Sequence, residues 1–100
     1  MSRIECVLLR TEDADKLRHL LKEVFPDADF KEEKDRLVGD STLERMWEII
    51  DKEGIRLVME DAAQEESGRL YLSKMAAFAG KVSLDESSPI GDITVHLEKD

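Results

Sequence analysis

The residues best suited to chemistry lie in one stretch, residues 67–84, which contains no acidic side chain. Its charged residues are Arg69, Lys74 and Lys81, so the stretch is locally positive in a chain whose formal net charge is −9. Spaced cations can contact the phosphates of RNA, and an aromatic ring among them, here Tyr71, can stack on a base. This composition favours a surface for an anionic partner.

Strand periodicity predicts which side chains share that surface. Leu70 and Leu72 alternate with polar residues, as do Val82 and Leu84, and a closing strand over residues 93–98 repeats the pattern. The outward side chains would then lie together on the open face of one sheet: Arg69, Tyr71, Lys81, Ser83, Thr94 and His96. The candidate binding residues are therefore Arg69, Tyr71, Lys74, Lys81 and His96, with Glu5 or Glu98 as acidic neighbours.

Two other interpretations of this surface stay open. The face can be merely solvated, or it can contact a second copy of the chain or another protein, together with the apolar side chains of Met75 and Phe78. The 24 acidic residues against 15 basic ones count against simple electrostatic binding of nucleic acid by the whole molecule. The sequence predicts a non-enzymatic binding or adaptor protein with RNA or a ribonucleoprotein as partner. The alternative is a homodimer or protein-interaction module.

Catalytic motifs fail when the residues they need are checked. Gly80 and Lys81 are like the end of a phosphate-binding loop, but Met75 stands where the first glycine is required and Val82 where Ser or Thr must meet magnesium. The two histidines are far apart in the sequence, and no HxxxH or CxxC pattern is present. We therefore expect no enzyme activity, no cofactor, no metal site and no small-molecule substrate.

Length and composition predict a single α+β domain over residues 1–100. Hydrophobic residues make up 41% of the chain and charged residues 39%, which suits one core under a dense cover of charge. No apolar run approaches the roughly 20 residues of a membrane span, and the opening residues do not form a signal peptide, so we expect a cytoplasmic protein. Cys6, the only cysteine, is expected to be a small buried hydrophobe.

Hydrophobic periodicity and turn residues divide the chain into elements. In chain order they predict a strand at 3–9, a helix from a Thr11 cap to Phe25 and Pro26, a hairpin over 28–40, a helix from a capping box at 41–44 to Gly54, a helix from Ile55 to about Ser67, and strands at 69–73, 81–84 and 93–98. Residues 74–80 are expected to form a single helical turn or a tight loop, and residues 87–91 a turn. The order β-α-β-β-α-α-β-turn-β-β favours a two-layer α+β sandwich, with helices packed on one face of a mostly antiparallel sheet.

Two segments carry the most specific part of a family resemblance. They are residues 74–82, KMAAFAGKV, and residues 88–91, SPIG, and similarity extends over nearly the whole sequence. On these residues the chain resembles a family of small archaeal proteins of uncharacterised function, uncharacterised protein family 0201. That family is similar in fold to the large-subunit ribosomal protein that binds the small ribosomal RNA, which implies helices on a mostly antiparallel sheet. The resemblance implies RNA association by analogy of fold and brings no catalytic residues.

Overall fold

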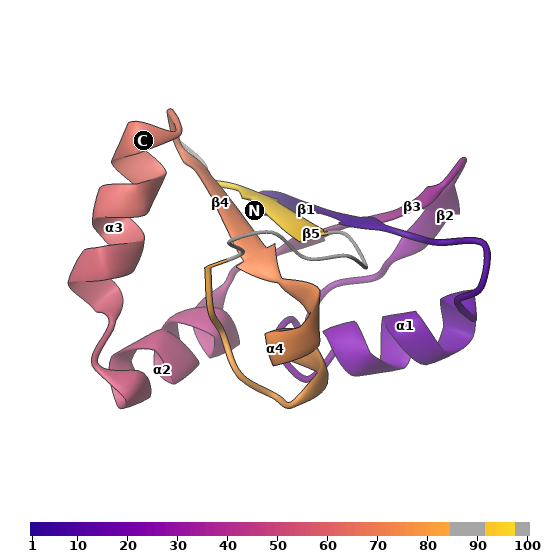
Figure 1. The fold of residues 1–100 in the computed structure, drawn as a ribbon, viewed down its shortest axis with the longest axis horizontal. Helices are drawn as coiled ribbons and strands as arrows, with labels where there is room; N and C mark the ends of the chain where they lie inside the picture. The colour runs from indigo at the N-terminus through magenta and orange to yellow at the C-terminus, as the bar shows by residue number, and fades with distance from the viewer. Residues whose placement is uncertain (85–91, 98–100) are drawn as a thin grey trace.

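The computed structural model describes residues 1–84 and 92–97. Its elements, in chain order, are β1 (Ser2–Val7), α1 (Ala14–Leu21), β2 (Lys31–Glu33), β3 (Arg36–Ser41), α2 (Glu44–Glu53), α3 (Arg56–Glu65), β4 (Arg69–Ser73), α4 (Lys74–Phe78) and β5 (Asp92–His96). The strands form one antiparallel sheet in the order β2-β3-β1-β5-β4; α1, α2 and α4 lie below it in Figure 1, and α3 packs beside β4. This confirms the predicted α+β sandwich.

Alternation along β1 sets the two faces of the sheet. Ile4 and Cys6 are fully buried toward the helices, whereas Arg3 and Glu5 point to the other side. β1 is the central strand and pairs with β3 on one side and β5 on the other. Because side chains alternate with a period of two, this register fixes the direction of each side chain in the neighbouring strands.

One hydrophobic core fills the space between the sheet and the helices. Each large side chain buried there contributes about 1.5–3 kcal/mol relative to exposure. The sheet supplies Ile4, Leu37, Leu70, Leu72, Ile93 and Val95, and the helices supply Leu17, Leu21, Met46, Ile50 and Met59. Phe25 and Phe30, on either side of a loop, meet edge to face with ring centroids 6.4 Å apart. Within the described residues, no helix combines the length and the apolar character needed to cross a bilayer.

Both edges of the sheet are poor templates for a further strand. β2 is only three residues long (Lys31–Glu33), and all of them are charged and exposed. On the other edge, the Ser73 amide of β4 donates to the Ser83 carbonyl oxygen at 2.7 Å, and Leu84 forms an isolated bridge with Leu72. A short charged strand at one edge and a partly occupied strand at the other both oppose pairing with another chain.

The predicted strand over residues 81–84 is wrong. The Lys81 amide still donates to the Ala76 carbonyl oxygen at 2.9 Å, so the start of this segment closes α4 and only its last residues reach β4. Val82 is nevertheless buried and Leu84 packs against the core, so their predicted inward direction is confirmed. The predicted turn at residues 87–91 and the end of the predicted strand at Glu98 lie outside the described residues.

The start of α2 is held by a residue distant in the sequence and not by the predicted capping box at 41–44. Leu43, which precedes the helix, has a left-handed φ of 66° and makes no side-chain cap. The Ser41 hydroxyl accepts from the Leu43 amide at 2.9 Å and donates to Asp27 Oδ1 at 2.5 Å. Asp27 Oδ2 accepts from the amide and the hydroxyl of Thr42 at 2.8 and 2.9 Å. The capping-box prediction is therefore wrong, because Ser41 is the last residue of β3 and its hydroxyl donates a hydrogen bond to Asp27.

The cap of α1 also differs from the prediction. Asp13, and not Thr11, caps the helix, since its Oδ1 accepts from the amides of Asp15 and Lys16. Regular helix then ends at Leu21, ahead of the predicted stop at Phe25 and Pro26. The hairpin over 28–40, the stop of α2 at Gly54 and the short helix within 74–80 are confirmed.

The Asp27 contacts predict a pH-dependent contribution to stability. Loss of hydration would raise the pKa of Asp27, but hydrogen bonds from Ser41 and Thr42 outweigh it and lower the pKa below its usual value. A carboxylate with a depressed folded pKa stabilises the fold above the unfolded pKa of about 3.9, and this contribution is lost as the pH falls through the folded value. We expect Asp27→Ala to lower the free energy of unfolding by about 1 kcal/mol at pH 7, as measured by urea denaturation.

The matched control is Asp29→Ala, which removes an exposed carboxylate two residues away. This variant should unfold like the wild type at pH 7. The gap between the wild type and Asp27→Ala should close as the pH falls through the depressed folded pKa of Asp27, because both states of Asp27 are protonated below it. Equal stability of the two variants at pH 7, or a gap that persists at low pH, would contradict this role of Asp27.

Candidate functional site

The open face of the sheet is the side turned away from α1, α2 and α4 (Figure 1). Side chains at alternate strand positions form it, and the pairing of the strands places them in rows. The members described are Lys31, Glu33, Arg36, Val38, Asp40, Arg3, Glu5, Val7, Thr94, His96, Arg69, Tyr71 and Ser73. Residues paired across neighbouring strands make up one row of this face.

One row of the open face carries basic side chains on three adjacent strands. Arg3 of β1 is directly opposite His96 of β5, and His96 is directly opposite Arg69 of β4. Neighbouring strands lie about 4.8 Å apart, so the row extends over about 10 Å. Asp40 of β3 faces Arg3 at the other end. We call Arg3, His96 and Arg69 the basic row.

The next row brings an aromatic ring beside the basic row. Tyr71 of β4 is opposite Thr94 of β5, which is in turn opposite Glu5 of β1. The Tyr71 side chain is half-buried. It borders a hollow of about 150 Å³ between the end of α3 and β4, lined by Ala62, Glu65, Glu66, Arg69, Tyr71 and Leu84.

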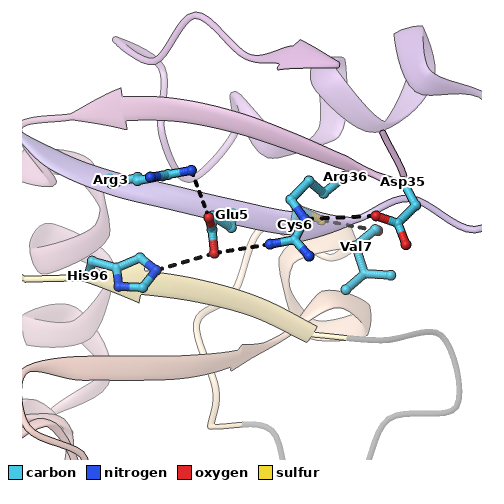
Figure 2. A network of polar contacts seen from close by, with 7 residues as sticks. All are labelled: Arg3, Glu5, Cys6, Val7, Asp35, Arg36 and His96. Carbon is cyan, nitrogen blue, oxygen red and sulfur yellow. Dashed lines mark hydrogen bonds and ion pairs between the residues drawn. The ribbon is translucent and has the colours of Figure 1, made fainter. Parts of the chain in front are cut away.

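Glu5 is the acidic centre of the open face (Figure 2). Its Oε1 lies 2.9 Å from Arg3 Nη2, and its Oε2 lies 3.6 Å from Arg36 Nη1 and 3.3 Å from His96 Nε2. These basic side chains come from β1, β3 and β5 and are 54%, 48% and 37% exposed, against 21% for Glu5. Glu5 is therefore the least exposed of the four, and its basic partners keep much of their surface in solvent.

The structure brings together three of the five candidate residues inferred from the sequence. Arg69, Tyr71 and His96 lie in two neighbouring rows of the open face, with Thr94 among them. Glu5 lies next to His96, as the strand phases predict. Lys74 and Lys81 lie elsewhere, although they share the acid-free stretch with Arg69.

Lys74 is buried and belongs to the helix side of the sheet. Its side chain is 0% exposed at the start of α4, and Nζ donates to the Val7 carbonyl oxygen at 2.5 Å and to Glu12 Oε1 at 2.7 Å. Glu12 also accepts from the Leu9 amide at 2.8 Å. Lys74 thereby ties α4 to the end of β1 and to the segment before α1. Its inferred place on the binding surface is corrected, because α4 begins directly after β4 and directs this side chain inward.

Lys81 is exposed but is separated from the basic row. Its amide hydrogen bond to Ala76 places it beside the end of α4, which lies below the sheet. The strand that would have carried Lys81 and Ser83 onto the open face does not form. The inferred grouping of these two residues with Arg69 is corrected accordingly.

Arg3 and Arg36 also belong to the site, but they lie outside the acid-free stretch of residues 67–84 and were not predicted from it. Arg3 alternates with Ile4 and Cys6, and this period already indicates an outward side chain. Arg36 joins the network only because β3 pairs with β1, which composition does not show. Strand phase combined with pairing is the signal that finds them.

A second polar cluster joins α2 to α3. The Arg56 guanidinium lies 4.7 Å from the centroid of the Trp47 ring and donates to both carboxylate oxygens of Asp51. These hydrogen bonds lower the pKa of Asp51 below its usual value. The side chains border a hollow of about 370 Å³ with Thr42, Glu44 and Glu48. In the part of the chain that the structure describes, no group of His, Cys, Asp and Glu side chains could hold a metal ion.

Comparison with known proteins identifies the family. No family model matches the chain. A UPF0201 protein of Methanothermobacter thermautotrophicus is 34% identical over 107 residues, which covers 98% of this chain and 81% of that protein. The chain belongs to the UPF0201 family. A UPF0201 protein of Thermococcus onnurineus is 30% identical, with 92% of this chain and 77% of that protein covered.

The fold is also shared with a solved UPF0201 protein. The crystal structure of the UPF0201 protein from Methanococcus jannaschii matches with a TM-score of 0.79 over 94% of this chain and 77% of that chain, at 24% identity. At this identity the likeness shows the fold alone. A further solved relative is described as an uncharacterised UPF0201 protein. Membership in the UPF0201 family thus supports the architecture and assigns no activity.

The burial of Lys74 predicts a structural role in this UPF0201 chain. Lys74→Ala removes one partner of a buried ion pair and leaves Glu12 and the Val7 carbonyl oxygen without its ammonium group. We expect the free energy of unfolding to fall by about 3 kcal/mol, as measured by urea denaturation.

Lys81→Ala is the matched control, since it removes a lysine from the same stretch at an exposed position. It should change the free energy of unfolding by no more than about 0.5 kcal/mol. A Lys74→Ala protein as stable as Lys81→Ala would show that the buried pair does not support the fold.

Proposed function

We propose that this protein is a non-enzymatic binding protein of the cytoplasm that contacts RNA, alone or in a ribonucleoprotein, through the open face of its sheet. The observation that carries the proposal is the register of β1, β5 and β4, which aligns Arg3, His96 and Arg69 in one row. Tyr71 supplies a ring in the adjacent row, and Arg36 supplies a further cation. Sheets that bind RNA use such a combination of cations for phosphates and exposed rings for bases.

The net charge of −9 is compatible with a local cationic surface. Charges in solvent are screened over about 8 Å at physiological ionic strength, so distant acids act weakly on a phosphate held at the basic row. Arg3 and His96 are 54% and 37% exposed and are therefore accessible to a ligand. Arginine is well suited to this task because its planar guanidinium can donate two parallel hydrogen bonds to a phosphate.

Tyr71 supports a single-stranded partner. An unpaired base can stack on an aromatic side chain, whereas the bases of a duplex are already stacked on each other. Such stacking contributes about 1–3 kcal/mol per base. Tyr71 and Arg69 border a hollow of about 150 Å³, which Glu65 and Glu66 also line.

The sequence resemblance to uncharacterised protein family 0201 carries the expectation of a fold like that of the large-subunit ribosomal protein that binds the small ribosomal RNA. By analogy of fold, this expectation favours an RNA ligand. Fold is a weak guide to function, so the residues of the open face carry the proposal and the resemblance supports it.

The proposal predicts salt-dependent RNA binding that requires the arginines of the open face. The triple variant Arg3→Gln, Arg36→Gln, Arg69→Gln removes up to three phosphate contacts. We expect its affinity for a labelled single-stranded RNA to fall at least about tenfold at low salt, and the slope of log K against log salt to flatten by about 2. Fluorescence anisotropy between about 50 and 200 mM salt measures both quantities.

The matched control removes the same charge elsewhere. Lys16→Gln, Lys22→Gln, Lys52→Gln changes three exposed lysines on or after α1 and α2. This variant should keep most of the affinity and most of the salt slope. Equal losses in the two triple variants, or no RNA binding by the wild type at low salt, would overturn the proposal.

An alternative function rests on the apolar side chains of α4. Met75 and Phe78 are 61% and 37% exposed and lie three residues apart, so they share one side of the helix. In this alternative the protein is a homodimer or an interaction module. The partner that covers α4 is then a second copy of the chain. Exposed apolar side chains that lie together are typical of contact surfaces.

Sedimentation equilibrium tests the alternative directly. If α4 forms a dimer contact, the wild type should show a dimer whose fraction grows with concentration, and Met75→Lys, Phe78→Lys should be monomeric. Leu57→Lys, at a side chain that is 76% exposed on α3, should leave the dimer intact. A wild type that is monomeric at every concentration would exclude this contact.

A further inference from the structure

The network around Glu5 has an arrangement that resembles a filled anion site. Basic side chains from three strands converge on a single carboxylate: Arg3 of β1, Arg36 of β3 and His96 of β5 (Figure 2). Glu5 itself lies on the central strand, opposite Val38 on one side and Thr94 on the other. The carboxylate therefore has short, uncharged side chains beside it in its own row and cations in the rows on either side.

We propose that the Glu5 carboxylate occupies, in the unliganded protein, the position that an RNA phosphate takes on the open face, and that Glu5 thereby weakens and filters anion binding. This inference rests on the proposed function, because it states how Glu5 regulates the proposed binding of RNA. Carboxylate and phosphate oxygens accept the same charge-assisted hydrogen bonds from guanidinium groups. A ligand phosphate must compete with Glu5 for Arg3, Arg36 and His96.

The exposure of the network shows how this competition can proceed. An arginine has five N–H donors, and the contacts of Arg3 and Arg36 with Glu5 each involve one terminal nitrogen. Both side chains are about half exposed, so a phosphate can approach them from solvent while Glu5 is still in place. Exposed ion pairs are individually weak, commonly below about 1 kcal/mol, and the cations can therefore change partner.

Competition by a tethered carboxylate favours ligands that carry several phosphates. Glu5 is held beside its cations by the backbone, so it acts at a high effective concentration. A single phosphate ion is not tethered and competes poorly. A polynucleotide gains additional contacts at Arg69 and Tyr71, which lie outside the Glu5 network, and can displace the carboxylate through its combined contacts. Glu5 thus selects polyanions over small anions.

The test compares Glu5→Gln with the wild type in the same RNA-binding measurement. Glutamine keeps the size and an acceptor oxygen but removes the charge, so Arg3, Arg36 and His96 lose the carboxylate that competes with phosphate. Arg36 keeps Asp35 as a neighbour, whose Oδ1 lies 3.8 Å from its Nε. We expect affinity for single-stranded RNA to rise about tenfold at low salt, and the slope of log K against log salt to steepen by about 0.7 or more. Binding of inorganic phosphate, followed by the NMR signals of the His96 ring, should become detectable in Glu5→Gln at concentrations that leave the wild type unchanged.

Glu32→Gln is the matched control for the change in charge. Glu32 lies in the same sheet on β2, is exposed, and is in register with the core-facing Leu37, so it belongs to the opposite face from Glu5. This variant should bind RNA with nearly the affinity and slope of the wild type. Thermal unfolding of both variants checks that the fold is intact, and a purely structural Glu5 would change the unfolding temperature without changing the salt slope.

The outcomes separate this inference from the proposed function. If the wild type binds RNA and Glu5→Gln binds no more tightly than Glu32→Gln, Glu5 does not compete with phosphate and the inference is overturned while the proposed function stands. If only Glu5→Gln binds, the competition is supported and the proposed function of the wild type fails. If neither protein binds RNA or phosphate, both are overturned.

Discussion

The pairing of β1 with both β3 and β5 is the constraint on which the rest of the molecule depends. Burial of Ile4 and Cys6 fixes which side of this central strand faces the helices, and the period of two then directs Arg3 and Glu5 to the other side. A shift by one residue would move the cations into the core and the apolar side chains into solvent. The hydrophobic core and the open-face network are therefore two results of one register. Stability and surface chemistry are specified together.

Most of the fold could be predicted from the sequence because periodicity reports burial. A strand with one buried side and a helix with one buried side each space their apolar residues at a characteristic period. This spacing predicted β1, β3, β4, β5 and the three longer helices. The residues that cap the helices were harder to predict from the sequence. Ser41 has a capping residue's chemistry, but its hydroxyl is bound to Asp27, fourteen residues earlier, and Leu43 takes a left-handed backbone. Contacts between distant segments decide such details, and local spacing does not record them.

The candidate site could be predicted only where strand phase applied. Arg69, Tyr71 and His96 are in strands, and alternation with buried neighbours gives their direction. Lys74 follows β4 at a point where alternation stops, and its charge gave no sign that it pairs with Glu12 inside the protein. Counting charge along residues 67–84 therefore grouped side chains that point to different parts of the molecule. The cations that do meet, at Glu5, come from strands far apart in the sequence.

The edges of the sheet have a consequence for how this chain can meet other macromolecules. Recognition by strand addition needs a length of unpaired backbone donors and acceptors. β2 offers a three-residue row with charged side chains, and the outer edge of β4 is met by Ser83 and Leu84 of its own chain. Strand addition depends on backbone hydrogen bonds, so it discriminates little between sequences and also promotes aggregation. In the described part of the protein this mode of binding is disfavoured. Contacts are left to side chains on a face, where single substitutions can tune them without altering the sheet.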